Sequence, residues 1–241
     1  MFYQSIRIQI AIITKLINNT KFKIDKGDHL LDTHTHILWN IDDGSKNQCM
    51  SLQMLEIAAR SGTKAIFATP HVIERANKPS WEEIKEKTQQ LRQLCAEAQI
   101  DIMLYPGAEV QMNWELLPEL GATGAYCLNG GRYLLIELPA AEIPAYADEF
   151  WYELELKGIT PILAHPERYQ QLRENPDLLL LWRRRGMLMQ CNSGSFTGMF
   201  GSSVCENAKV LLANGLVDLL GSDGHRSEGR NTDMSRAAAV P

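Results

Sequence analysis

The sequence predicts one α/β domain, built as a distorted (β/α)7 TIM-like barrel with a metal site at the carboxyl ends of its strands. Two observations predict this architecture. Short apolar runs alternate with stretches of helical apolar spacing from residue 29 onward. Residue types that bind metals follow the runs at positions 36, 71, 109, 137, 165, 192 and 223, which are 27 to 38 residues apart. Each step has the length of one strand–helix unit of a parallel sheet.

A closed barrel explains this pattern better than an open, doubly wound sheet. The carboxyl ends of barrel strands meet at one mouth, where barrel enzymes have their sites. Residues at every strand end of an open sheet could not converge on one crevice. The chain has 241 residues, 45% of them hydrophobic, which is enough for one such domain. We expect residues 29–241 to form the barrel domain, with a short C-terminal part, and residues 1–28 to be an N-terminal extension without an evident role.

The expected strands are the apolar runs. They lie at residues 30–31, 65–70, 100–105, 133–136, 159–164, 187–190 and 217–220. Helix signals separate them. Ser80-x-x-Glu83 and Ser203-x-x-Glu206 have the pattern of capping boxes, and Asn175-Pro176 that of an N-cap before a first-turn proline. The expected helices lie at about 47–60, 80–98, 144–157, 175–185 and 203–214, and a glycine follows each of them except 80–98.

The composition argues against several classes of function. A formal net charge of −5 does not favour a nucleic-acid partner. No apolar run has the length of a membrane helix, and residues 5–18 lack a signal-peptide cleavage site. The alternating isoleucines of that segment predict a half-buried strand instead. The five cysteines are scattered without a Cys-x-x-Cys pair, which indicates reduced thiols in a cytoplasmic protein.

The polar residues after the runs predict a metal centre. His34 and His36 are two apart on an expected strand, so both point to one face and can reach one cation. Nitrogen and carboxylate ligands without thiolates suit Mn²⁺, Fe²⁺ or Zn²⁺. Two or three bridged ions would activate a water and hold the oxygens of a displaced phosphate. The candidate ligands are His34, His36, Asp42 or Asp43, His71, Glu109, Glu137, His165, Asp223 and His225.

The order of these motifs resembles the polymerase and histidinol phosphatase (PHP) superfamily. Within it, the chain is similar to the manganese-dependent protein-tyrosine phosphatases of bacterial capsule and exopolysaccharide loci. The matching motifs run from about residue 30 to 230 and include Asp-x-His-x-His, Ala-Thr-Pro-His, Gly-Ala-Glu and Gly-Ser-Asp-x-His. The segments 41–44 (Ile-Asp-Asp-Gly) and 165–169 (His-Pro-Glu-Arg-Tyr) favour this branch over the histidinol phosphatases.

The resemblance implies a division of ligands among three metal sites. The first would use His34, His36, Glu109 and Asp223; the second Glu109, Glu137 and His165; and the third Asp43, His71 and His225. It also implies Mn²⁺ as the cofactor and Arg168 and Arg230 as the catalytic arginines. Each arginine closely follows a candidate ligand, and a guanidinium fork matches two phosphate oxygens.

The implied function is hydrolysis of phosphotyrosine on a protein, with the tail of a tyrosine autokinase that controls polysaccharide export as the substrate. Three alternatives stay open: a phosphoesterase for a small ester such as histidinol phosphate, a metal-bound binding module without catalysis, and a metal-dependent amide hydrolase. A cysteine-dependent phosphatase is disfavoured, because it needs an arginine six residues after its cysteine. The nearest pair, Cys127 and Arg132, is one residue short. The sequence leaves open whether the protein forms a homo-oligomer.

Overall fold

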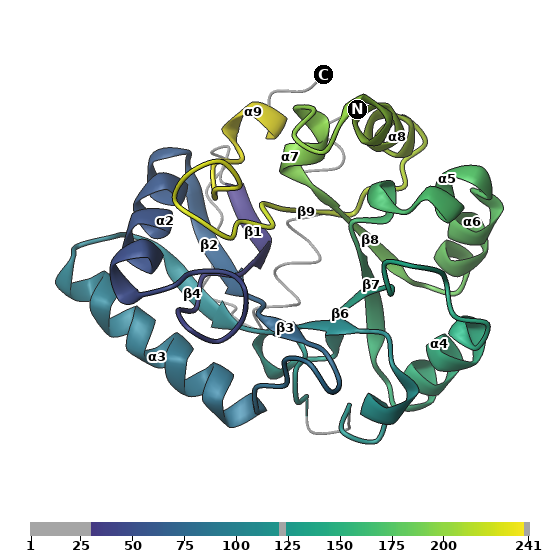
Figure 1. The fold of residues 1–241 in the computed structure, drawn as a ribbon, viewed down its shortest axis with the longest axis horizontal. Coiled ribbons are helices and arrows are strands. Elements are labelled where there is room, and N and C mark those ends of the chain that lie inside the picture. The colour runs from purple at the N-terminus through teal and green to yellow at the C-terminus, as the bar shows by residue number, and fades with distance from the viewer. Residues whose placement is uncertain (1–29, 121–123, 239–241) are drawn as a thin grey trace.

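The computed structural model describes residues 30–120 and 124–238. Its strands form two curled sheets around one axis, with the helices outside them (Figure 1). The strand order is β1-β2-β4 in the first sheet and β3-β5-β6-β7-β8-β9 in the second. All paired strands are parallel, as expected for repeated strand–helix units.

The element bounds are as follows. The strands are β1 (Leu30–Thr35), β2 (Thr63–Ala68), β3 (His71–Val72), β4 (Met103–Pro106), β5 (Glu109–Gln111), β6 (Tyr133–Glu137), β7 (Thr160–Ala164), β8 (Leu188–Asn192) and β9 (Leu219–Gly221). The α-helices are α2 (Gln48–Arg60), α3 (Trp81–Glu97), α4 (Ala147–Leu156), α5 (Gln170–Glu174), α6 (Asp177–Arg184), α7 (Ser193–Phe196), α8 (Ser202–Ala213) and α9 (Ser235–Ala238). Short 3₁₀ helices lie at η1 (Trp114–Leu116), η2 (Leu128–Gly130) and η3 (Pro166–Arg168).

The ring closes between β9 and β1. The backbone N–H of Asp223 donates to the carbonyl of His34 at 2.7 Å, and that of His36 donates to the carbonyl of Gly224 at 2.9 Å. A parallel bridge joins Thr35 to Gly224. Seven strand positions therefore surround the axis, with β2 and β3 sharing the second and β4 and β5 the third. The predicted distorted (β/α)7 barrel is confirmed.

The second and third strand positions are broken, which the sequence did not predict. His71 and Glu109 begin the short strands β3 and β5 instead of following continuous strands. Pro70 lies in the first break, and a proline has no N–H to donate to a sheet. Its carbonyl still accepts a hydrogen bond from the N–H of Glu109 at 3.0 Å. The break moves both side chains past the ends of β2 and β4, toward the barrel mouth.

The helix signals were partly right. Ser80 caps α3 through its side chain, as the sequence predicts, and Asn47 caps α2 in the same way without having been predicted as a cap. Ser203 is not a cap, because α8 begins one residue earlier, after Gly201. Asn175 makes no side-chain cap of α6, whose N-cap position is Pro176. The proposed strand within residues 5–18 and the N-terminal extension lie outside the described residues.

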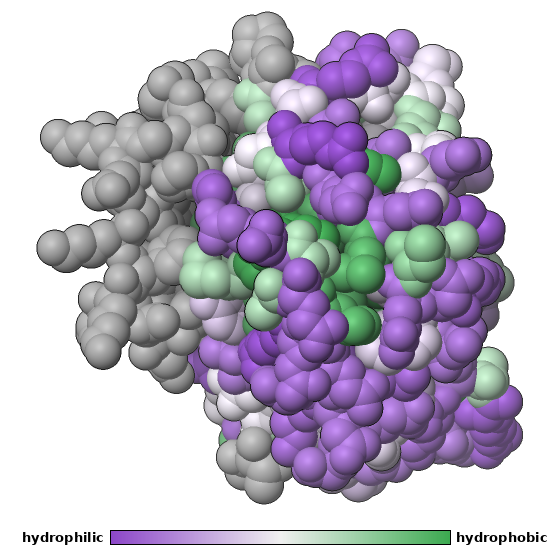
Figure 2. Space-filling model, turned by 90° about the vertical axis from the view of Figure 1, so that its left-hand side faces the viewer, coloured by the Kyte–Doolittle hydropathy of each residue, from purple (hydrophilic) through white to green (hydrophobic). Residues whose placement is uncertain are grey.

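Two hydrophobic clusters form the core, one on each face of the strands. Phe67, Leu135 and Ile162 belong to a cluster of alternate strand residues that fills the barrel interior. Ile66 and Ile136 point the other way and pack in the cluster between strands and helices. Figure 2 looks onto the α2 and α3 side, which is hydrophilic around a smaller hydrophobic area. Within the described residues, no helix combines the length and apolar character needed to cross a bilayer.

Candidate metal centre

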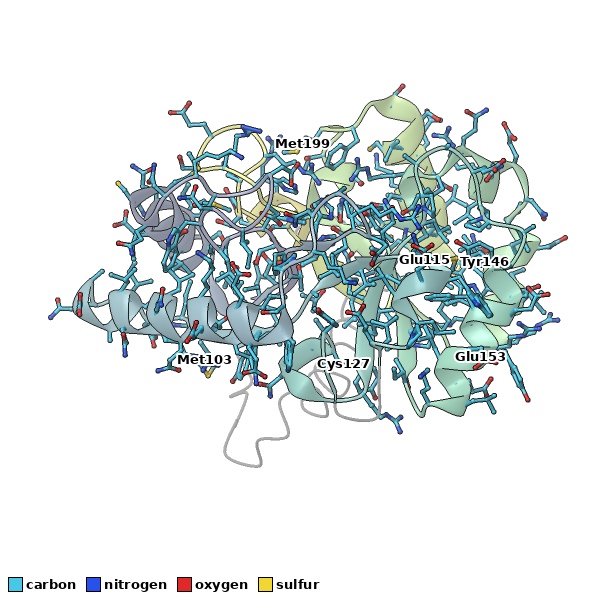
Figure 3. All side chains as sticks on the ribbon, turned by 60° about the horizontal axis from the view of Figure 1, so that its bottom comes forward. Met103, Glu115, Cys127, Tyr146, Glu153 and Met199 are labelled. Carbon is cyan, nitrogen blue, oxygen red and sulfur yellow. The ribbon has the colours of Figure 1, made fainter. Side chains whose placement is uncertain are left out.

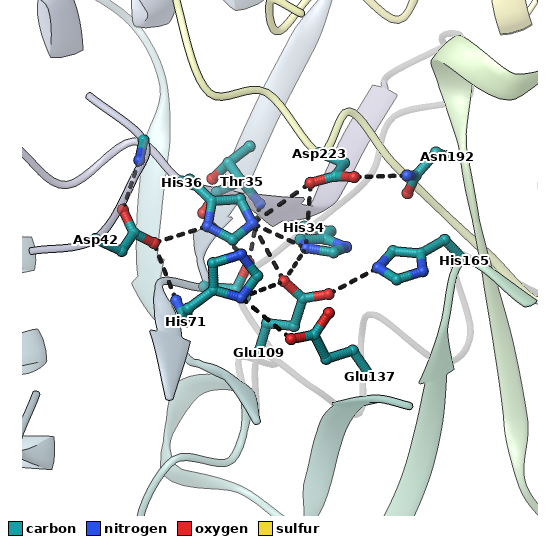
Figure 4. A network of polar contacts seen from close by, with 12 residues as sticks. His34, Thr35, His36, Asp42, His71, Glu109, Glu137, His165, Asn192 and Asp223 are labelled. Carbon is teal, nitrogen blue, oxygen red and sulfur yellow. Dashed lines mark hydrogen bonds and ion pairs between the residues drawn. The ribbon is translucent and has the colours of Figure 1, made fainter. Parts of the chain in front are cut away.

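The structure brings the nine predicted ligands together at the carboxyl ends of the strands. Figure 4 shows most of this cluster, with side chains from both sheets pointing toward one another. Four overlapping groups have ligand atoms that all lie within 4.8 Å of one another. They are His34, His36 and Asp223; His34, Glu109 and His165; His71, Glu109 and Glu137; and His36, Asp43, His71 and His225.

Glu109 lies at the middle of the cluster. Its Oε2 is 3.1 Å from Nε2 of His34 and 3.1 Å from Nδ1 of His71. Its Oε1 is 2.9 Å from Nε2 of His165. The two carboxylate oxygens therefore face different groups of nitrogens. Glu109 belongs to two of the four groups and could contribute a ligand atom to both.

A second group of candidate ligands, which includes Asp43, lies on the α2 side of the cluster. Oδ1 of Asp43 is 3.4 Å from Nε2 of His225 and 3.7 Å from Nε2 of His71. The Asp43 side chain is 65% exposed, whereas that of His225 is 4% exposed and Glu109 is buried. This group therefore meets solvent mainly through Asp43.

Hydrogen bonds orient three of the imidazoles. Nδ1 of His34 lies 3.0 Å from Oε1 of Gln190, Nδ1 of His36 lies 2.7 Å from Oδ2 of Asp42, and Nδ1 of His225 lies 3.0 Å from the carbonyl of Asp223. These partners are acceptors, so each Nδ1 carries the proton in the neutral ring. The lone pair of each Nε2 then points into the cluster, which is how proteins prepare histidine to bind a metal.

The residues present fit divalent cations. Nε2 of His34 and Nε2 of His36 are 3.1 Å apart, the spacing of neighbouring ligands on one ion with bonds of about 2.1 Å. Among the described residues, Oδ1 of Asp223, Nδ1 of His71 and Nε2 of His225 are buried and have no hydrogen-bond partner. Buried polar atoms in proteins are normally satisfied. A metal ion at each group would satisfy them.

The electrostatics of the cluster lead to the same conclusion. Burial alone would raise the pKa of Glu109, yet His34 and His71 hold it well below its usual range. Burial opposes a charge on His36, yet Asp42 and Asp223 raise the pKa of this histidine well above its usual value. The buried carboxylates therefore need positive charge beside them, which either imidazolium protons or bound cations can supply.

The two neighbouring aspartates have different surroundings. Asp42 accepts from His36 and, at 3.0 Å, from the backbone N–H of His71, so it holds two candidate ligands in place. Asp43 faces His71 and His225 directly. Gly44 allows the loop to fold back here, because a Cβ on it would lie 2.1 Å from the carbonyl oxygen of His36. This arrangement fits Asp43 as the ligand and Asp42 as its support.

Both predicted arginines lie beside the cluster and share one anchor. Nη1 of Arg168 is 3.2 Å from Oδ2 of Asp223, and Arg230 pairs with the same oxygen. Asn192 donates to it as well, at 2.6 Å. Three donors on Oδ2 leave Oδ1 facing the imidazoles of His34 and His36. The arginine side chains are 33% and 30% exposed, so they can contact a bound anion.

Phe200 supports both arginines and was missed by the sequence analysis. The guanidinium carbons of Arg168 and Arg230 lie 4.7 Å and 5.5 Å from the centroid of its ring. Phe200 follows Met199 on the loop between α7 and α8, where Figure 3 labels Met199. Gly194 permits this packing, because a Cβ on it would lie 2.9 Å from Sδ of Met199. No periodicity or spacing in the sequence marks Phe200.

Glu167 fixes the segment that carries Arg168. Its side chain is fully buried, and Oε1 accepts from the backbone N–H of Asn192 at 2.9 Å and from Oγ of Ser195 at 2.6 Å. These bonds tie η3 to the end of β8 and to α7. The sequence analysis contained Glu167 only as part of a motif, and gave it no role.

The chain is similar to a known protein family over the whole of its described length. The family described as capsular polysaccharide synthesis, CpsB/CapC, matches residues 30–240. The tyrosine-protein phosphatase YwqE of Bacillus subtilis is 34% identical over 88% of this chain and 83% of its own length. The tyrosine-protein phosphatase CpsB of Streptococcus pneumoniae is 29% identical over 86% of this chain and 88% of its own.

Solved structures agree with this comparison. A structure from work on YwqE of Bacillus subtilis and CpsB of Streptococcus pneumoniae, described as unique metal-dependent tyrosine phosphatases, superposes with a TM-score of 0.81 at 34% identity. It covers 86% of this chain and 84% of that one. Histidinol phosphate phosphatase of Lactococcus lactis has a TM-score of 0.54 at 16% identity, with 88% and 94% covered. The second match shows a shared fold only.

Proposed function

This chain belongs to the CpsB/CapC family of capsular polysaccharide synthesis, and on that premise we propose that it is a metal-dependent phosphatase that hydrolyses phosphotyrosine on proteins. One observation carries the proposal. Nine metal-ligand side chains from separate strand ends converge beside two partly exposed arginines. Cations and arginines around one opening can activate water and stabilise the charge that develops when a phosphate monoester is hydrolysed.

We propose that the three ligand sets given by the resemblance hold two or three divalent ions, with Mn²⁺ as the cofactor and Fe²⁺ or Zn²⁺ as alternatives. Glu109 would be shared by the first two sets, since its two oxygens face different nitrogens. Bound ions of this kind supply an activated water and neutralise charge on phosphate oxygens.

The arginines would hold the phosphoryl group. Arg168 and Arg230 donate to the same oxygen of Asp223, and both pack on Phe200, so their guanidinium groups are held on one side of the centre. From there they can donate to the outer oxygens of a phosphate while charge on those oxygens increases. The tyrosine leaves as a phenol with an ordinary pKa of about 10. It therefore needs less help from an acid than an alkoxide does.

The proposed partner is the tyrosine-rich tail of an autophosphorylating kinase of polysaccharide export, and the proposed location is the cytoplasm. The family assignment supports the partner. The location is supported by the five cysteines, all of which are free thiols. The histidinol phosphatase alternative has weaker support, because its solved relatives share only the fold with this chain.

Metal analysis together with hydrolysis of a phosphotyrosine peptide tests the proposal. Chelation should abolish turnover and Mn²⁺ should restore it. Glu109→Gln should lower kcat/KM by at least about 100-fold, because the bridging carboxylate is lost. Glu115→Gln is the matched control, since Glu115 is exposed and forms an ion pair with Arg75 away from the metal centre. Full activity after chelation, or faster hydrolysis of histidinol phosphate than of the peptide, would reject the proposal.

A further inference from the structure

A cleft opens from the metal centre between the loop after β6 and the segment of η3 and α5. Its volume is about 390 Å³, within the range of sites that bind small ligands or side chains. Glu137, His165 and Arg168 line its inner end. The cleft is therefore continuous with the centre at which the phosphoryl group would react.

The walls of this cleft are held by hydrogen bonds between the two segments. The hydroxyl of Tyr169 accepts from the N–H of Leu138 at 2.9 Å and donates to its carbonyl at 3.3 Å. Farther out, Oε1 of Gln171 accepts from the N–H of Ile143 at 2.7 Å. Bonds at both ends of the loop fix its backbone against η3 and α5. The cleft is thus formed before any ligand enters.

The chemistry of the cleft changes along its length. At the inner end lies His165, whose side chain is only 7% exposed. Its Nδ1 is buried and has no hydrogen-bond partner among the described residues. The wall that follows is formed by Pro139 and the two alanines after it, with the buried Leu138 behind them. A wall of this kind suits an aromatic ring.

The outer rim is acidic. Glu142 and Glu174 are both exposed and lie on opposite sides of the opening. Neither forms an ion pair with a Lys, Arg or His side chain in residues 30–120 or 124–238. Glu174 accepts a hydrogen bond only from a neutral donor, Nε2 of Gln170 at 2.7 Å, among the bonds described. Two exposed carboxylates without an ion-pair partner at a rim attract a cation on the bound molecule.

We propose that this cleft binds the phosphotyrosine side chain through its apolar wall, and that Glu142 and Glu174 select substrates with Lys or Arg next to the phosphotyrosine. The inference rests on the proposed function and adds the class of peptide. The bound phosphate would lie at the inner end, beside Arg168. The residues flanking the tyrosine would then leave the cleft across the acidic rim.

Two peptides test this selection. They carry the same phosphotyrosine, flanked by Lys residues in one and by Glu residues in the other. The readout is the ratio of their kcat/KM values, which does not depend on metal loading or on the folded fraction. An exposed ion pair changes binding by about 1.4- to 5-fold. With two carboxylates, the wild-type protein should prefer the Lys peptide by about tenfold in low salt, and by less in 1 M salt.

Charge reversal at the rim should reverse this preference. The double variant Glu142→Lys, Glu174→Lys should favour the Glu peptide. The matched control is Glu86→Lys, Glu97→Lys, which changes the net charge equally on the exposed face of α3, across the barrel from α5 (Figure 1). This control should keep the wild-type ratio.

The outcomes separate the two proposals. An equal rate on both peptides in the wild type, or the same ratio in the rim variant as in the wild type, would refute the selection by the rim while leaving phosphotyrosine hydrolysis in place. A similar shift in the α3 control would show that net charge, and not the cleft, sets the preference. If metal-loaded wild type hydrolyses neither peptide but does hydrolyse histidinol phosphate, the proposed function itself is wrong.

Discussion

Replacing Phe200 by leucine should weaken the arginine pair without removing either arginine. The variant keeps a hydrophobic side chain but loses the ring beneath Arg168 and Arg230, at 4.7 Å and 5.5 Å. A cation–π contact contributes about 0.5–1 kcal/mol at exposed sites and more when it is desolvated. Both guanidinium groups are about one third exposed, so the lower range applies. The two contacts together then contribute about 1–2 kcal/mol, which corresponds to a decrease of about 5- to 30-fold in kcat/KM.

The assay is phosphotyrosine peptide hydrolysis together with inhibition by inorganic phosphate. The inhibition constant for phosphate should rise with the loss of kcat/KM, because the arginines contact the same anion in both cases. Phe200→Trp keeps an aromatic ring and should recover most of the activity. Met199→Leu changes the neighbouring residue, which is 47% exposed and should be neutral. If Phe200→Leu behaves like Met199→Leu, or if tryptophan does not restore activity, the ring does not position the arginines.

Two further predictions concern the barrel itself. Phe67→Ala should lower the free energy of unfolding by about 3–5 kcal/mol, because the ring is fully buried in the barrel interior; urea titration measures it, and a loss below about 1 kcal/mol would mean that the interior can repack. Burial raises the pKa of Cys127 to about 12, so at pH 8 a maleimide should label the exposed Cys49 and leave Cys127 unmodified. Between pH 9 and about 12, the Cys127 thiol keeps its proton in the folded chain. In the unfolded chain its pKa is near the ordinary 9.0, so the thiol loses its proton in this range. Its contribution to stability is therefore present below pH 9 and is lost as pH rises toward 12.

The sequence predicted the architecture and the side chains that meet at the strand ends, because both depend on local patterns. An apolar run followed by His, Glu or Asp favours a strand end, and the spacing of the runs sets the number of strand–helix units. Parallel strands of a barrel present these ends at one mouth. His34, Glu109 and Asp223 could thus be grouped although they are far apart in the chain.

The residues that support the centre could not be predicted in this way. Gln190 orients His34 from β8, and Phe200 contacts two arginines from a loop between helices. Both roles depend on which side chains face each other across the barrel. The periodicity within one segment gives no information about such contacts. The break at Pro70 is a different case. The proline was visible, but whether it ends a strand or interrupts one depends on its pairing with the next strand.

The closure of the barrel and the formation of the metal centre depend on the same few bonds. β1 carries His34, and Asp223 follows β9 at the other end of the barrel sequence. The N–H of Asp223 donates to the carbonyl of His34, so the two ends meet at the first proposed metal site. Asp223 has φ 52°, a left-handed conformation that is costly for a residue other than glycine and is held here by its surroundings. In that conformation one of its carboxylate oxygens faces the imidazoles and the other receives Arg168, Arg230 and Asn192. A chain that has not paired β9 with β1 has neither the first proposed metal site nor the anchor of its arginines, so phosphate binding should require this pairing.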